Sequence, residues 1–191
     1  MPSILKPLQI TRRASLLGLT CFWLIGHWTL AADKRESAGE YQVKAAFIFN
    51  FIKFTDWPAT SFPAAESPIV IGIVGDDPFG NMLDEMVTGE VVHGRPISVK
   101  RFRVEDDLRL CQVVFISHSE TEHLPTLLSR LKGNPALTIS DINGFAQQGG
   151  MVSLLVVQKT VKLEINRAVA EEACVQISGK LLNLASIVKS K

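Results

Sequence analysis

The stretch "IVIGIVGDDPFG", residues 69–80, decides the fold class. Its first half is a run of branched apolar residues without polar alternation, which is typical of a parallel strand buried on both faces. Gly75 ends this run, and Asp76, Asp77 and Pro78 follow. Proline suits the first turn of a helix, where its missing N–H is no loss. The stretch therefore predicts a strand that leads directly into a helix, as in α/β proteins.

The two aspartates allow two interpretations, a catalytic pair or the start of a helix. With Pro78 in the first helical turn, Asp77 stands at the N-cap, where its carboxylate accepts from free N–H groups two or three residues further on. Its charge also suits the helix dipole. The motifs GxSxG, HExxH, GxGxxG and GxxxxGK[ST] do not occur in the sequence. We therefore interpret Asp77 as a helix cap and expect no enzyme; a hydrolase built on Asp76 and Asp77 is the weakest alternative.

The rest of the chain alternates apolar segments with segments of helical period. Two strands, 151–159 and 161–166, are separated by so little that they predict an antiparallel hairpin. Three more strands are expected at 97–102, 112–117 and 137–141, and helices at 41–56, 79–88, 122–132, 168–174 and 179–189. This order predicts an α/β three-layer sandwich with a mostly parallel sheet of five to six strands, which ends in the hairpin and is flanked by helices.

The first 32 residues have the order of a secretory signal peptide. Lys6 and Arg12–Arg13 precede the apolar run 14–25, and small residues lead to Ala32. As a membrane anchor, the alternative, the run is shorter than the roughly 20 residues that a span needs. Cleavage after Ala32 would leave a flexible segment, 33–40, and a single domain, 41–191, outside the cytoplasm. The twin arginines leave both the general and the twin-arginine export route open.

Charge and cysteine content narrow the function further. Removal of residues 1–32 takes three of the 20 basic residues and none of the 19 acidic ones, so the mature net charge is −2. Such a balance argues against nucleic-acid binding, which needs a basic surface. Cys21 leaves with the leader, while Cys111 and Cys174 enter an oxidising compartment and either bridge or remain free. Neither has CxxC spacing, so we expect no redox or zinc chemistry, and no metal or cofactor.

The predicted first helix, "YQVKAAFIFNFIKFTDWP" (41–58), is apolar on two sides. At 3.6 residues per turn it has one stripe of Val43, Phe47, Asn50 and Phe54 and another of Tyr41, Ala45, Ile48 and Ile52. One stripe would face the sheet, and the other a second subunit, a partner protein or the C-terminal helices. If the Ile48 stripe faces outward, a two-fold dimer would cover it. Asn50 within its stripe would tie the helix to a loop or contact a ligand.

Two further polar residues follow predicted strands. Asp141 stands at the end of a strand where α/β sheets commonly bind ligands, although an Asx-turn would also explain it. Asn166 stands at the end of the hairpin. The candidate partner or ligand surface therefore comprises Lys44, Ile48, Asn50, Ile52, Asp141 and Asn166.

Six stretches in this order resemble the YfiR family of periplasmic regulators. They are "YQVKAAFIFNFIKFTDWP", "GIVGDDPFG", "VHGRPISVKRF", "CQVVFIS", "LTISDINGFAQQGGM" and "VKLEINRAVAEEACVQISGKLLNLASIVK", and they span residues 41–189. The resemblance implies a small, often dimeric α/β protein. It also implies a function without chemistry: inhibition of an inner-membrane diguanylate cyclase through its periplasmic sensor region, relieved by an outer-membrane lipoprotein, so that cyclic-di-GMP and biofilm formation are controlled.

A second function class stays open beside this interaction module. The chain would then be a periplasmic sensor that binds a small ligand at the strand ends around Asp76, Asp141 and Asn166. It would serve another membrane signalling protein, such as a histidine kinase. A tight ligand would raise the melting temperature by mass action, whereas a protein-binding module would not respond to metabolites.

Overall fold

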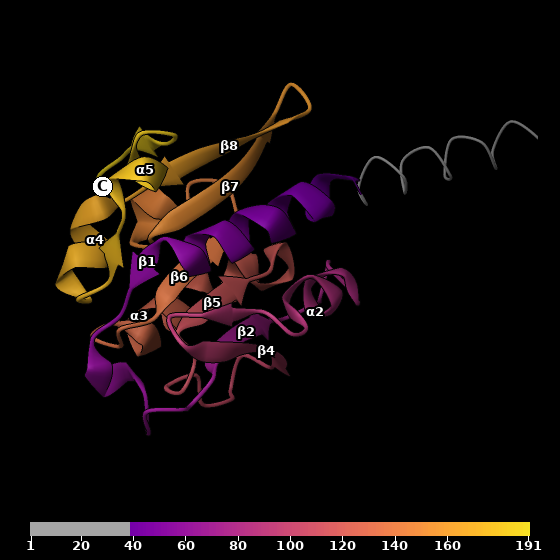
Figure 1. The fold of residues 1–191 in the computed structure, drawn as a ribbon. Helices are drawn as coiled ribbons and strands as arrows, with labels where there is room; N and C mark the ends of the chain where they lie inside the picture. Colours follow the sequence, from indigo (N-terminus) through magenta and orange to yellow (C-terminus); the bar gives the residue numbers. More distant parts are fainter. Residues whose placement is uncertain (1–38) are drawn as a thin grey trace, which may run out of the picture. The chain divides into compact units, whose positions relative to one another are not determined.

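The computed structural model describes residues 39–191 (Figure 1). The predicted signal peptide, 1–32, and most of the segment 33–40 lie outside the described residues. Within the described part, no helix is both long and apolar enough to cross a membrane.

An eight-stranded mixed sheet forms the centre of the described chain, in the order β10-β8-β7-β6-β5-β2-β4-β3. Its strands are β2 (Ile69–Val74), β3 (Val91–Val92), β4 (Arg95–Phe102), β5 (Val113–Ile116), β6 (Leu137–Ser140), β7 (Val152–Val157), β8 (Thr160–Ile165) and β10 (Ser186–Ile187). β4, β2, β5, β6 and β7 are mutually parallel, whereas β7–β8 and β3–β4 are antiparallel. The prediction of a mixed α/β fold with a mostly parallel sheet is therefore confirmed.

The strand count differs from the predicted five to six because two short strands extend the edges. β3 and β10 have two residues each, too few to produce an apolar pattern in the sequence. The hairpin β7–β8 does not end the sheet, because β10 pairs in parallel with β8. A separate two-stranded sheet joins β1 (Thr55–Asp56) to β9 (Gln176–Ile177).

Helices cover the sheet through two apolar clusters. Alternate residues of β2 enter different clusters, Ile71 one and Val70 the other, so the clusters lie on opposite sides of the sheet. On the Ile71 side lie the first helix (residues 39–53), α2 (Met82–Val87), α4 (Arg167–Glu172) and α5 (Gly179–Leu182). On the Val70 side lies α3 (Leu124–Leu131). The described residues also include three short 3-10 helices: η1 (Ala59–Ser61), η2 (His118–His123) and η3 (Ala146–Gln148). Figure 1 shows the first helix running along the sheet toward β1, with α4 and α5 at that end.

Asp77 is not a helix cap, contrary to the prediction. α2 begins at Met82 and Asn81 precedes it, because Gly80 has a φ of 56° and interrupts any helix started at Pro78. The Asp77 carboxylate instead accepts from the backbone N–H of Phe79 at 2.8 Å, which closes a turn. The hydrogen-bonding argument for Asp77 holds, but it applies to the turn rather than to the helix.

The two cysteines of the described chain do not form a disulfide. Cys111 is buried and Cys174 is exposed, and both are free. Cys111 belongs to the cluster on the α3 side, whereas Ala170 and Val175, which flank Cys174 in the chain, belong to the cluster on the other side. The sheet therefore separates the two thiols.

The predicted closing helix, 179–189, is also shorter than expected. α5 ends at Leu182, and the chain then extends to form β10 at the edge of the sheet. Leu184 is consequently 69% exposed.

Candidate functional site

The six candidate surface residues do not form one surface. Ile48 and Ile52 are fully buried, and Lys44 and Asn166 are buried as well. The side chain of Asp141 is 5% exposed. Of the six, only Asn50 is exposed to solvent. A binding surface on the first helix must therefore consist of Asn50 and other exposed residues of that helix.

The Ile48 stripe faces the sheet, so the dimer interface suggested for it is wrong. Ala45, Ile48 and Ile52 have no exposed surface, because they pack in the cluster that also contains β2, β5 and β6. Asn50, which was expected to tie the helix to a loop or contact a ligand, is exposed to solvent. Because each residue turns an α-helix by about 100°, residues two positions apart point in nearly opposite directions. Ile48 faces the sheet, so Asn50 faces solvent.

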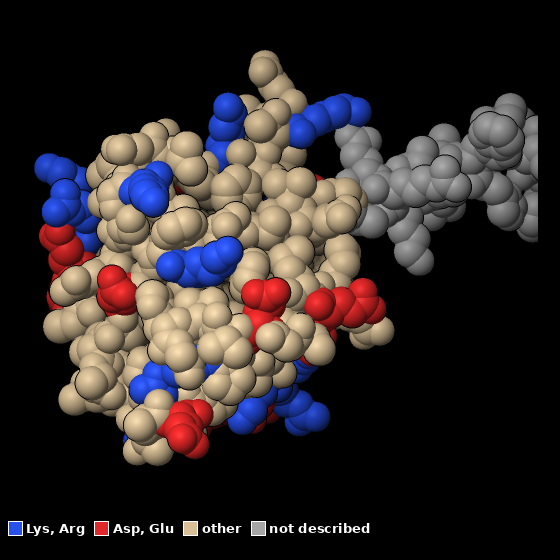
Figure 2. Space-filling view, viewed as in Figure 1, with Lys and Arg blue, Asp and Glu red and all other residues tan. Residues whose placement is uncertain are grey.

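The opposite side of the first helix forms an exposed surface, which we call the outer stripe: Val43, Phe47, Asn50 and Phe54. Val43 is 45% exposed, and Phe47 and Phe54 are partly exposed. Figure 2 shows that the surface over the first helix consists largely of uncharged side chains, with most acidic residues at its margins. An apolar helix face in water is typical of a protein-binding surface.

Two lysines border the end of the outer stripe nearest β1. The ammonium group of Lys53 lies 5.2 Å from the ring centre of Phe49, and that of Lys180 lies 5.5 Å from the ring centre of Phe54. α5 is held beside the first helix because the N–H of Ser178 donates to the carbonyl of Phe54 at 2.9 Å. Each of these lysines therefore lies over an aromatic ring.

A buried ionic cluster fixes the other end of the first helix to the sheet. The Lys44 ammonium donates to Asp141 Oδ2 at 2.9 Å and pairs with Glu40 one turn earlier. The Tyr41 hydroxyl donates to the same Asp141 oxygen at 2.9 Å. The Tyr41 ring packs edge-on against Phe79, with 5.6 Å between ring centres. We call Glu40, Tyr41, Lys44 and Asp141 the ionic latch.

The latch exists because β6 ends beside the helix. Asp141 directly follows β6, and Tyr41 and Lys44 are three residues apart on the side of the helix that faces the sheet. Burial and the negative charge of Asp141 raise the pKa of Tyr41 well above its ordinary value. The other carboxylate oxygen, Asp141 Oδ1, is buried without a hydrogen-bond partner. The sequence pointed to Lys44 and Asp141 separately, but nothing in it revealed that they pair.

The edge where α/β sheets often bind ligands is filled by side chains. The strand order reverses between β2 and β5, and the crevice beyond such strand ends is the usual binding position. Here Ser119 Oγ accepts from the N–H of Asp76 at 3.0 Å. A Cβ added to Gly75 would lie 2.4 Å from both Ser119 Oγ and Glu120 Oε1. These side chains occupy the crevice.

Asp76 and Asp77 do not act as a pair. Asp76 is exposed, whereas Asp77 is bound by Arg101, whose Nε donates to Asp77 Oδ2 at 2.9 Å. Arg101 also pairs with Asp84 on α2 at 2.5 Å, which lowers the pKa of Asp84 through hydrogen bonding to its carboxylate. Among residues 39–191, no three or more His, Cys, Asp or Glu side chains are grouped so that they could hold a metal ion.

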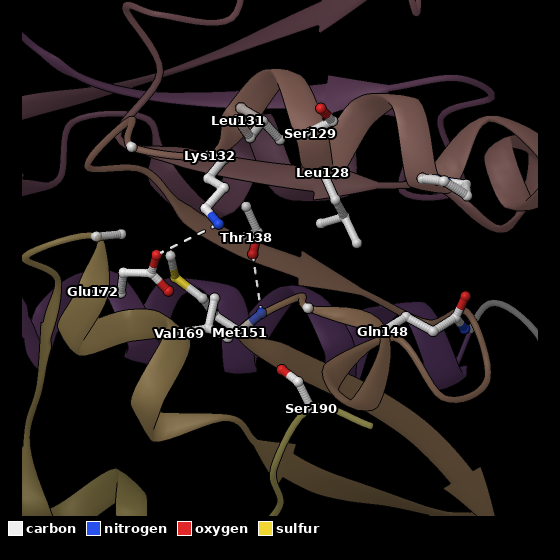
Figure 3. Close-up of a pocket in the computed structure, with 14 residues that line it drawn as sticks. Leu128, Ser129, Leu131, Lys132, Thr138, Gln148, Met151, Val169, Glu172 and Ser190 are labelled. Carbon is white, nitrogen blue, oxygen red and sulfur yellow. Dashed lines mark hydrogen bonds and ion pairs between the residues drawn. The ribbon is translucent and has the colours of Figure 1, made fainter.

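A cavity of about 460 Å³ lies between α3 and α4 (Figure 3). Apolar side chains from separate segments line it, including Leu128, Met151 and Val169. Lys132 and Glu172 reach toward each other across it, with 3.7 Å between Nζ and Oε1 (Figure 3). The sequence gave no sign of this cavity, because its walls come from α3, β6, the loop before β7, α4 and the chain's last residues.

Asn166 supports this cavity rather than lining it. Its Nδ2 donates to the carbonyl of Ala146 at 2.8 Å and to Ser190 Oγ at 2.9 Å. Its Oδ1 accepts from the N–H of Val169, as the N-cap of α4. The side-chain amide of Asn166 therefore holds together η3, α4 and the C-terminal residues of the chain.

Comparison with known proteins gives a family match. A family model described as YfiR/HmsC-like matches residues 41–186, which include nearly all described residues. No curated protein matches the chain significantly.

Proposed function

Because the chain belongs to the YfiR/HmsC-like family, we propose that it is a periplasmic regulator of an inner-membrane diguanylate cyclase. It binds the periplasmic sensor region of the cyclase and inhibits the synthesis of cyclic-di-GMP. Biofilm formation then falls as the amount of free regulator rises. An outer-membrane lipoprotein that binds the regulator relieves this inhibition.

The observation that carries this proposal is the family match over residues 41–186. The outer stripe supports it, because a regulator without chemistry of its own acts through a protein-binding surface. The filled crevice at the β2–β5 edge is consistent with a function that needs no substrate site. We therefore propose no catalytic residue in the described chain.

The proposal is tested in a strain from which the chain has been deleted. Cellular cyclic-di-GMP should rise on deletion and return to the original level when the chain is supplied with its leader. The mature chain, from Asp33 onward, should co-purify with a membrane protein that has a diguanylate cyclase output domain. Unchanged cyclic-di-GMP in the deletion strain would refute the proposal.

The cavity between α3 and α4 favours a second function, a small-ligand sensor for another membrane signalling protein such as a histidine kinase. Its volume of about 460 Å³ lies in the range of small-molecule sites. A ligand should raise the melting temperature, and Val169→Trp, which fills the cavity, should abolish that increase. A metabolite library that leaves the melting temperature of the wild-type protein unchanged would exclude this function.

A further inference from the structure

We propose that the outer stripe and α5 together bind an acidic amphipathic segment of the membrane partner. This inference rests on the proposed function, because it names the chemistry of the partner surface. It concerns Val43, Phe47, Asn50 and Phe54, with Lys53 and Lys180 at one end.

The spacing of the outer stripe fits a helical partner. Its members are separated by four, three and four residues, so they follow one face of the helix for about 16 Å at 1.5 Å per residue. A second amphipathic helix of about three turns can lie along such a face with apolar residues at the same spacing.

The charges specify the sign of the partner. Lys53 and Lys180 each lie over one aromatic ring and remain exposed on their other sides. Carboxylates of a partner that approached this end would meet two cations beside an apolar surface, where water is partly excluded and attraction is stronger. At the opposite end, Glu40 is already paired with Lys44.

The same charges argue against a second copy of this chain as the occupant. An identical surface would bring two more lysines to the interface. Like charges at an interface lower affinity. The outer stripe itself contributes no carboxylate to offset them.

Reversal of the charges of Lys53 and Lys180, with the variant expressed in the deletion strain, tests whether the partner segment is acidic. Lys53→Glu combined with Lys180→Glu should weaken binding to the co-purifying cyclase by roughly tenfold or more, and cyclic-di-GMP should stay near the level of the deletion strain. The matched control is Lys100→Glu, an exposed lysine on β4 that should regulate like the wild type. Periplasmic abundance and the melting temperature of both proteins establish that they fold.

Photo-cross-linking tests the apolar part. Benzoyl-phenylalanine in place of Val43 should cross-link the chain to the cyclase, and the same group in place of Val91, an exposed valine on β3, should not. Cross-links between two copies of the chain would overturn the inference, because the outer stripe would then be a dimer interface. Normal regulation by the folded Lys53→Glu/Lys180→Glu protein would also overturn it. In both cases the proposed function stands, since it fails only if deletion leaves cyclic-di-GMP unchanged.

Discussion

Asp141 uses its two carboxylate oxygens very differently. Oδ2 accepts from both Lys44 and Tyr41, whereas Oδ1 is buried without a partner. A buried ion pair contributes little net stability when it forms, because both ions lose water, but the loss of one partner leaves an uncompensated charge. The latch therefore specifies where the first helix sits more than it stabilises the fold.

Replacement of Lys44 should reveal this asymmetry. Lys44→Met should lower the free energy of unfolding by about 3–5 kcal/mol, since Asp141 remains buried without its cation. The double variant Lys44→Met/Asp141→Leu should recover part of this loss. Urea unfolding measures all the variants, and Lys53→Met, on the exposed side of the same helix, serves as the control. Equal losses in the single and double variants would contradict the role of the pair.

The two thiols should differ sharply in reactivity. Burial raises the pKa of Cys111 to about 11, so little thiolate forms near neutral pH. In the mature chain, a thiol reagent at pH 8 should therefore modify Cys174 quickly and Cys111 only after denaturation. Mass spectrometry of the labelled peptides identifies the modified residue. Two unreactive thiols in the native protein that become reactive on reduction would instead indicate a disulfide.

At the scale of elements, the first helix was predictable as a helix but not in its orientation. Both of its stripes contain large apolar residues, so apolar period alone did not choose between them. Asn50 was the available signal, because a polar residue within one stripe favours that stripe as the outward one. Long strands such as β2 were predictable because they are continuously apolar. The two-residue strands β1, β9 and β10 and the early end of α5 depend on pairing partners distant in sequence.

The orientation of the first helix gives a paired prediction. Ile48→Asp should destabilise the chain by about 4 kcal/mol or more, because it buries an unpaired charge in the apolar cluster. Val43→Asp, on the outer stripe, should change the free energy of unfolding by about 0.5 kcal/mol or less. Circular dichroism during urea unfolding measures both. A folded, stable Ile48→Asp protein would mean that the helix packs the other way round.

At the scale of the whole molecule, the mixed α/β class with a mostly parallel sheet followed from the sequence, whereas the order of the strands in the sheet and the cavity did not. Long buried strands such as β2 and β5 left a local signal, because burial on both faces gives consecutive apolar residues. The cavity walls instead come from five segments that meet only after folding. Leu128 and Val169 illustrate this difference. Each has the sequence pattern of an ordinary apolar helix residue, and the cavity forms only because α3 and α4 leave a gap between them.

The fold should lose stability on the alkaline side. Tyr41 and Cys111 both have a raised pKa in the folded state, from ordinary values of 10.0 and 9.0. The folded state therefore holds these protons more tightly than the unfolded state. Their contribution to stability is complete below about pH 9 and is lost as the pH rises toward the folded-state values. Urea unfolding between pH 7 and 11 measures the decline, and Cys111→Ala should flatten it; an unchanged slope would contradict the assignment.

The pairing of β1 with β9 also determines when the C-terminal end of the first helix is fixed during synthesis. The first helix ends at a strand whose only partner in the described sheet is residues 176–177, and the carbonyl of Phe54 is bound by Ser178. A ribosome adds about 5–20 residues per second, so the helix emerges many seconds before the segment that secures its C-terminal end. During this interval its aromatic side chains are unprotected, and a holding chaperone has a clear target.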